Sequence, residues 1–222
     1  NNILELVHRT EPQFEIEKIE LNDPQTLQLF QRGDTSGVFQ FESTGIRNVL
    51  RKVHPTDFGL VVAVNALYRP GPMENIDRFV KRKDHLEPYR FPNQILERVL
   101  GETYGILVYQ EQVMEVASAM GGLSLGQADL LRRAMSKKKH AVIEQMRTNF
   151  IQGAVQKGYS EKIAQQVYRY IENFANYGFN KSHAVAYSKL AFQLAYLKAH
   201  YPGDFYTALL NSVVGNDTKT KT

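Results

Sequence analysis

Basic side chains gather between residues 124 and 140, and their types suit the binding of phosphate groups. At about 100° per residue they fall on one side of a helix. The side chains concerned are Arg132, Arg133, Lys137, Lys139 and His140. No acidic residue occurs from Leu130 to Ile143, so little charge nearby neutralises them. Lys and Arg on a helix can hold phosphates and stabilise charge during phosphoryl transfer without making or breaking bonds themselves.

The helix that carries these side chains is expected to begin at Ser124, because Ser124 with Gln127 three residues later forms a capping box. Asp129 is placed to pair with Arg133 one turn further on. Lys138 falls on the apolar side, so we expect the helix to fray or end near it. The apolar side itself is expected to consist of Leu130, Leu131, Ala134 and Met135.

A basic run is often only the solvated face of a helix, and three consecutive lysines also occur in nuclear-import signals. The segment at 177–183 favours a functional interpretation. There a glycine-containing turn is expected to bring Lys181, a capping Ser182 and His183 to the start of another helix. Free backbone N–H groups at a helix start attract anions, and phosphate is the commonest biological anion. Together the two segments predict a polyphosphate or nucleic-acid site.

Composition limits the class of protein. The chain has 222 residues, enough for one large domain or two small ones, and 43% hydrophobic content is enough for a core. Its net charge of +4 is too mild to indicate nucleic acid by itself. The absence of cysteine excludes disulfides, thiol catalysis and cysteine-based zinc sites. Without a membrane-length apolar run or a signal-peptide pattern, we expect a cytoplasmic protein with no membrane partner, and the initial Asn1 suggests a piece of a longer chain.

Helical periodicity dominates the sequence, which predicts a mainly α fold, a multi-helix domain with one or two short extended segments. The extended segments are expected at 38–41 and 104–108. The prolines at positions 88 and 92 mark the expected boundary between two subdomains. The predicted organisation is a lead-in linker at 1–21, a first helical subdomain at 22–90, a second one at 91–212 and a polar tail at 213–222.

Several kinds of catalytic centre lack their residues in this sequence. Nucleotidyl transfer needs two or more carboxylates that converge on magnesium, and the sequence has no Asp-x-Asp. It also has no P-loop, no GxGxxG after a strand and no histidine spacing typical of zinc sites. Tyr109 and Glu111 have simple structural interpretations, as a core ring and as a carboxylate that favours the start of a helix. A self-sufficient enzyme is therefore not expected.

Five motifs occur in an order that resembles one known family. They are GVFQFES at 37–43, RPGP at 69–72, YGILVYQEQVM at 104–114, LRRAMSKKK at 131–139 and YGFNKSH at 177–183. Together they resemble the fingers region of the bacterial replicative DNA polymerase III alpha subunits, the family C polymerases. The resemblance runs from about residue 19 to about residue 210, nearly the whole chain.

The resemblance implies a largely helical fingers domain that closes over the incoming deoxynucleoside triphosphate (dNTP) and helps to place the template. Tyr109 and Glu111 match family residues at or beside the active site, and the arginine pair on the basic helix matches the family's pair that approaches the triphosphate. The nucleotide-binding residues expected on this basis are Arg132, Arg133, Lys137, Asn180, Lys181 and His183. No catalytic residue and no metal ligand is expected in this chain, because the family's Mg²⁺-binding aspartates belong to the palm domain.

The resemblance also implies partners. They are the template–primer DNA, dNTP as substrate, the palm and thumb domains of the full-length chain, and replisome subunits such as the sliding clamp, which would bind through other regions. This chain alone is then expected to be inactive, because the palm aspartates are absent from it. Two alternatives follow from the residues alone: an independent nucleic-acid-binding module without a nucleotide role, or a structural helical domain whose basic helix meets an acidic protein partner.

Overall fold

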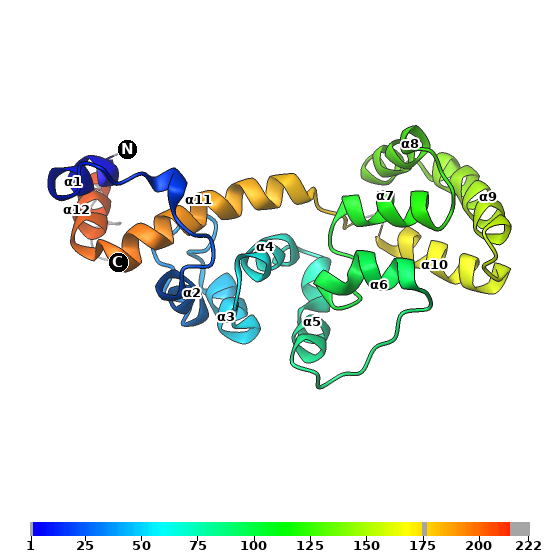
Figure 1. Ribbon diagram of the computed structural model, residues 1–222, viewed down its shortest axis with the longest axis horizontal. Coiled ribbons are helices and arrows are strands. Elements are labelled where there is room, and N and C mark those ends of the chain that lie inside the picture. The colour runs from blue at the N-terminus through cyan, green and yellow to red at the C-terminus, as the bar shows by residue number, and fades with distance from the viewer. Residues whose placement is uncertain (1, 175–176, 214–222) are drawn as a thin grey trace. The chain divides into compact units, whose positions relative to one another are not determined.

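The structure, a computed structural model, describes residues 2–174 and 177–213. Within these residues the chain consists of α-helices and short 3-10 helices (η) without a β-sheet, so the prediction of a mainly α fold is confirmed. The packing divides the chain into two compact units, one made of Asn1–Asn65 and Val185–Thr222 and the other of Ala66–Ala184. The chain leaves unit 1 within α4 (Phe58–Leu67) and returns to it within α11 (Lys181–His200) (Figure 1).

Unit 1 contains helices from both ends of the chain. Its α1 and α12 helices lie side by side (Figure 1). Aromatic rings contribute to its core, where the ring centroid of Phe30 lies 5.3 Å from that of Phe41 and 5.8 Å from that of Phe192. Besides its parts of α4 and α11, the unit consists of α1 (Asn2–Thr10), η1 (Ile16–Lys18), α2 (Pro24–Gln31), α3 (Thr44–Val53) and α12 (Pro202–Val213).

Residues 2–21 are part of this folded unit rather than the predicted linker. Val7 on α1 is fully buried and Ile16 on η1 is nearly so, and both pack with Leu197 and Phe205. The apolar residues Ile3, Leu4 and Val7 of the nine-residue α1 helix follow helical spacing and pack into one cluster, a signal that the prediction of a linker missed. Of the predicted polar tail, residue 213 ends α12, and residues 214–222 lie outside the described part of the chain.

The segment at 38–41 forms turns instead of the predicted extended segment. The amide of Val38 donates to the carbonyl of Thr35 at 3.0 Å, and the amide of Phe41 donates to the carbonyl of Val38 at 3.0 Å. Gln40 adopts a left-handed φ of 70°. Val38 and Phe41 are both fully buried, so burial at a turn, not pairing of strands, explains the alternation of apolar and polar residues here.

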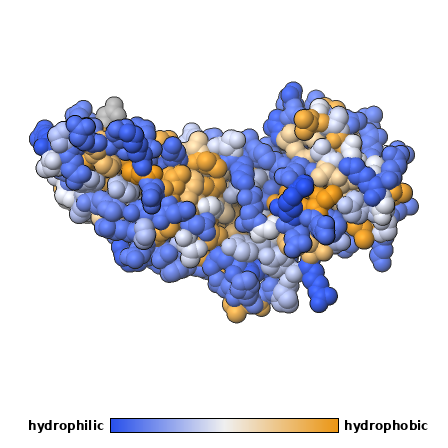
Figure 2. Space-filling model, in the orientation of Figure 1, coloured by the Kyte–Doolittle hydropathy of each residue, from blue (hydrophilic) through white to orange (hydrophobic). Residues whose placement is uncertain are grey.

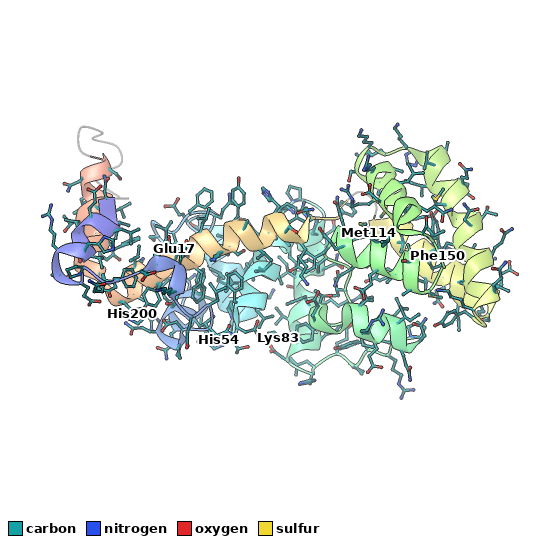
Figure 3. All side chains as sticks on the ribbon, turned by 45° about the horizontal axis from the view of Figure 1, so that its top comes forward. Glu17, His54, Lys83, Met114, Phe150 and His200 are labelled. Carbon is teal, nitrogen blue, oxygen red and sulfur yellow. The ribbon has the colours of Figure 1, made fainter. Side chains whose placement is uncertain are left out.

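Unit 2 holds the helices that carry the candidate site residues. Side chains from all the helices from α6 through α10 form its core, which includes the fully buried side chains of Leu131, Phe150 and Tyr168. Met114 on α7 packs against this core, and Figure 3 labels it together with Phe150 on α9. Before the first turn of α11, the unit consists of η2 (Pro72–Asn75), α5 (Ile76–Lys83), α6 (Gln94–Leu100), η3 (Gly101–Thr103), α7 (Gln110–Ala119), α8 (Leu125–Ser136), α9 (His140–Gln156) and α10 (Glu161–Phe174).

The boundary between the two units does not lie at the prolines at positions 88 and 92, where it was predicted. The α5 helix, which precedes these prolines, packs within unit 2, where the ring centroid of Phe79 lies 5.1 Å from that of Tyr104. Arg82 Nη1 also donates to the carbonyl oxygen of Tyr104 at 3.2 Å. The proline-containing loop therefore connects two parts of one unit. Prolines predict where a helix is interrupted, but they carry no information on which helices pack together.

Candidate functional site

The α8 helix, which carries both candidate arginines, begins and ends as the sequence predicts. Ser124 Oγ accepts from the Gln127 amide at 3.2 Å, and Gln127 Oε1 accepts from the Ser124 amide at 2.9 Å, which is the expected capping box. The helix ends at Ser136, and Lys138 adopts a left-handed φ of 53°. Because a residue in that conformation cannot continue an α-helix, the predicted end near Lys138 is confirmed.

The buried side of α8 differs from the prediction at one position. Leu130 is 46% exposed, although we expected it among the apolar side chains that face the core. The face of α8 that packs against α7 and α9 is narrower than predicted, so Leu130 lies at the edge of this face. Figure 2 shows hydrophobic side chains at the surface over α8, next to hydrophilic ones. The residues of α8 that are buried are Ala128, Leu131, Ala134 and Met135.

The five basic side chains do not share one helix face. Arg132 and Arg133 lie on α8, and Lys137 is the residue that caps its C-terminal end. Lys139 stands at the N-cap of α9, and His140 is the first residue of that helix. The prediction of a single basic stripe is therefore wrong. The chain turns at Lys138, which has a left-handed φ, and α9 then begins with a different axis. Lys139 and His140 therefore do not continue the face of α8 that carries the arginines.

Asp129 bridges the two arginines. Arg132 Nη2 and Nε donate to Asp129 Oδ1 at 2.8 and 2.9 Å, and Arg133 Nη2 lies 2.5 Å from Oδ2. The predicted pair of Asp129 and Arg133 is confirmed, and the pair with Arg132 is an addition to it. Hydrogen bonds from Arg132 and Arg133 hold the pKa of Asp129 below its ordinary value. The side chain of Arg133 is 65% exposed, so it remains accessible to a ligand from solvent.

Gln110 joins segments that are far apart in the sequence. Its Nε2 donates to Ser136 Oγ at the end of α8 (3.0 Å) and to the carbonyl oxygen of Gly178 (3.1 Å). Its backbone amide donates to the carbonyl oxygen of Phe179 at 2.9 Å. Gln110 and Gly178 line one small depression together with Arg132. A glutamine in the first turn of a helix gives no sequence signal for this role, so it was not among the predicted site residues.

An isolated parallel bridge between Tyr109 and Phe179 fixes the turn before α11. The Phe179 amide donates to the carbonyl oxygen of Val108 at 3.3 Å. The prediction of extended structure at 104–108 is therefore confirmed only in part. Tyr104 adopts a left-handed φ of 53° in a turn, and the extended backbone follows it.

The start of α11 already holds a carboxylate of the chain itself. Asn180 Oδ1 accepts from the His183 amide at 2.7 Å, so Asn180 caps the helix. The predicted cap, Ser182, lies inside the first turn, because the helix begins earlier, at Lys181. Glu111 Oε2 accepts from the Lys181 amide at 2.9 Å, and Glu111 Oε1 accepts from Asn180 Nδ2 at 3.0 Å. An anion does sit at this helix start, but it is the carboxylate of Glu111.

Lys181 and Tyr109 meet beside this carboxylate. Lys181 Nζ lies 2.6 and 2.9 Å from the two carboxylate oxygens of Glu102 and 5.2 Å from the centroid of the Tyr109 ring. Tyr109 is 2% exposed, and its burial, together with the charges of Glu102 and Glu111, raises the pKa of its phenol. The phenol therefore stays protonated at neutral pH, and the ring is part of the core.

His183 and Arg69 both contact Phe179. The exposed His183 ring lies edge-on to the ring of Phe179, with 5.5 Å between centroids. The Arg69 guanidinium lies 4.2 Å from the centroid of the same ring, and its Nη2 donates to the carbonyl oxygen of Tyr177 at 2.8 Å. Unit 2 thus brings together the motifs at 69–72, 104–114, 131–139 and 177–183. Arg69 was missed as a candidate because only its motif, not its contact, can be seen in the sequence.

A buried glutamine fixes the segment that leads into α7. Gln112 is 3% exposed, and its Oε1 accepts from the amides of Val108 and Tyr109 at 2.9 and 3.0 Å. Its Nε2 donates to the carbonyl oxygen of Val99 at 3.2 Å and to Thr103 Oγ1 at 2.9 Å. The side chain therefore satisfies four polar groups and is itself satisfied, as a buried amide must be.

The carboxylates of the site are engaged with cationic and amide groups. Asp129 bridges two arginines, Glu111 lies at the start of α11 and Glu102 pairs with Lys181. In the described residues no group of three or more His, Cys, Asp and Glu side chains could hold a metal ion. The site residues that the structure describes do not fit a magnesium centre. Their cationic groups instead suit phosphate oxygens.

Comparison with known proteins identifies the family. The bacterial DNA polymerase III alpha subunit finger domain matches residues 1–158 of this chain. The chain belongs to this family. The resemblance carried by the motifs is therefore confirmed. The matched range includes α7 and α8 with their site residues, whereas the motif at 177–183 lies beyond it.

Relatives extend the match over most of the finger-domain chain. It is 53% identical to DNA polymerase III subunit alpha of Bacillus subtilis over 205 aligned residues, and this alignment covers 92% of the chain. It is 53% identical over 198 residues to the subunit of Halalkalibacterium halodurans, covering 89%, and 48% identical over 206 residues to that of Staphylococcus aureus, covering 93%. The match spans only 18–19% of the length of these relatives. No helix in the described part of the chain has the length and apolar character that a membrane span requires.

Proposed function

We propose that this chain is the fingers domain of a bacterial replicative DNA polymerase, where it binds the triphosphate of the incoming dNTP and helps to place the template. The observation that carries the proposal is the arginine pair on α8, where Arg132 and Arg133 share the carboxylate of Asp129. Guanidinium groups bind carboxylate and phosphate oxygens in the same bidentate way. A pair of arginines that holds a carboxylate between them is therefore suited to a phosphate.

The start of α11 supplies a second set of phosphate-binding groups. Asn180, Lys181 and His183 lie on one turn, and the Lys181 amide donates to Glu111. Amides at a helix start bind phosphate as readily as carboxylate. Lys137 adds a charge at the end of α8, next to the serine that Gln110 contacts. We propose that the dNTP phosphates compete with the chain's own carboxylates for both sets of groups.

The remaining parts of the polymerase are assigned to residues outside this chain. Mg²⁺ would be held by aspartates of a palm domain, because the residues described here do not fit a metal centre. The proposed partners are template–primer DNA, the palm and thumb domains, and replisome subunits such as the sliding clamp, with the assembly acting in the cytoplasm. The name of the relatives, DNA polymerase III subunit alpha, supports this assignment.

The 222-residue chain by itself is expected to show no primer extension with magnesium and all four dNTPs. The reason is that the sequence has no Asp-x-Asp, and the part of the chain that the structure describes holds no group of three or more His, Cys, Asp and Glu side chains that could bind a metal ion. Extension of a labelled primer is measured on a denaturing gel, with a complete polymerase of this family as the positive control. Extension above a reaction without protein would contradict the proposal.

DNA binding by the same chain is expected to be weak and sensitive to salt. A few contacts between basic side chains and phosphates release counterions, so raising the salt from about 50 to about 200 mM should lower the affinity roughly ten- to a hundredfold. Fluorescence anisotropy of a labelled primer–template measures the dissociation constant at each salt concentration. An affinity that does not change with salt would exclude the basic side chains beyond the end of α8, such as Lys137 and Lys139, as the contact surface.

A further inference from the structure

Unit 2 contains a second pocket that shares no residue with the candidate nucleotide-binding set. Its volume is about 470 Å³, and it lies between α5, α10 and the loop that joins α5 to α6. Figure 1 shows this loop as a long irregular segment below α6. Small-molecule sites in proteins typically have volumes of about 300–1,000 Å³. We infer that this pocket binds one nucleotide unit, that is, a phosphate joined to an aromatic base.

Positive charge in the pocket exceeds what its own carboxylates neutralise. Glu87 lies 3.3 Å from Arg78 Nε and 3.1 Å from Arg82 Nε. The side chains of Arg90 and Arg169, in contrast, make no ion pair and no hydrogen bond with any residue that the structure describes, and Arg169 has only a longer-range electrostatic attraction to Glu172 on the same helix. Two guanidinium groups at the pocket are therefore available to an anionic ligand, and guanidinium groups favour phosphate because they donate two parallel hydrogen bonds.

Aromatic rings form the walls beside these arginines. The rings of Tyr89 and Phe91 meet edge to face with 5.3 Å between centroids, and the Arg82 guanidinium lies 5.1 Å from the centroid of Tyr89. Tyr170 is held in place through its hydroxyl, which accepts from the Leu107 amide at 3.1 Å and donates to a neighbouring carbonyl oxygen at 3.1 Å. Part of this ring remains accessible to a ligand, because Tyr170 is 40% exposed. Such rings bind bases by stacking, regardless of sequence.

Amide side chains complete the pocket. Asn75, Gln166 and Asn173 line it, and none of them has a side-chain hydrogen bond to another residue in the described ranges. Each offers one acceptor and two donors, the groups that recognise the edge of a base. A site for inorganic phosphate alone would need the arginines but neither the rings nor the amides. The combination of the three therefore favours a nucleotide unit over a simple anion.

The test uses two fluorescent probes, a mant-labelled dATP and a labelled single-stranded oligonucleotide, each titrated into the 222-residue chain. All titrations are made in an Arg132→Ala, Arg133→Ala background, which removes the arginines of the candidate dNTP site. Failure of this proposal can thus be distinguished from failure of the proposed function. The measured quantity is the dissociation constant of each probe. Circular dichroism and the thermal midpoint establish that each variant remains folded.

In that background, the Arg90→Ala, Arg169→Ala double substitution is expected to weaken binding about tenfold or more, since each removes a charge-assisted contact from an exposed side chain. Phe91→Leu should also weaken binding, because stacking is lost while apolar volume is kept. Arg98→Ala is the matched control. Arg98 is a surface arginine of the same unit that does not line the pocket, so its removal should leave both dissociation constants unchanged.

The outcomes separate the two sources of a nucleotide unit. Binding of mant-dATP that weakens in the double variant supports a site for a free nucleotide. Binding of the oligonucleotide alone, weakened in the same way, supports a nucleotide within a single strand. The proposal is overturned if neither probe binds, or if the double variant binds as well as its parent. It is also overturned if inorganic phosphate displaces the probes as well as dATP does while Phe91→Leu has no effect, because the pocket is then a simple anion site.

Discussion

Arg132→Ala or Arg133→Ala, in the complete polymerase that contains this chain, is expected to lower kcat/KM for dNTP about ten- to a hundredfold. A charge-assisted contact between guanidinium and phosphate contributes roughly 1.5–3 kcal/mol, which corresponds to this range. The fold should survive, because α8 is anchored by buried side chains such as Leu131 and the two arginines lie off that side. Steady-state kinetics at varied dNTP concentration measures the effect. Lysine should restore little activity, since an ammonium group cannot reproduce the bidentate contact.

Arg98→Ala is the matched control for this experiment. Arg98 is 64% exposed and pairs with Glu115, much as Arg133 is 65% exposed and pairs with Asp129. The substitution therefore removes a similar surface ion pair from the same unit, and dNTP kinetics should not change. Template–primer affinity should change little in either arginine variant. If these variants lose DNA affinity while KM for dNTP and kcat hold, the arginines bind the duplex and the proposed contact is wrong.

Gly153→Ala is expected to lower the free energy of unfolding by about 2–3 kcal/mol, the cost of overpacking a tight core. A Cβ atom at Gly153 on α9 would lie 1.9 Å from the carbonyl oxygen of Gly121, which follows α7. Both groups belong to the backbone, so no side-chain rotation can relieve the contact and the helices would have to separate. Urea unfolding of the 222-residue chain, followed by circular dichroism, measures the change.

Gly126→Ala provides the control for the stability measurement. Gly126 lies on α8, and a Cβ atom there would meet nothing within 4 Å. Alanine favours the helical conformation over glycine by about 0.5–1 kcal/mol, so this variant should be at least as stable as the parent. A Gly153→Ala protein as stable as the Gly126→Ala protein would show that α9 does not approach the end of α7 this closely.

Local features of the sequence determined much of this protein. The capping box of Ser124 and Gln127, the end of α8 near Lys138 and the pair of Asp129 with Arg133 all depend on residues within one or two turns of each other. Such contacts follow from helical geometry, whatever the rest of the chain does. The helical class followed from the same periodicity, and five separated motifs were enough to predict the family.

The tertiary structure alone decided what occupies the candidate site. Glu111 lies at the start of α11 and contacts Lys181, 70 positions later in the chain, while Gln110 joins Ser136 to Gly178. The division into two units, which places the first and last helices in one unit, also depends on packing between distant segments. Periodicity shows which side of a helix is apolar, but not which other helix will cover it. The contacts of Lys181 with Glu111 and Glu102 were therefore missed, because these carboxylates come from other helices, whereas the pair of Asp129 with Arg133, one turn apart on the same helix, could be predicted.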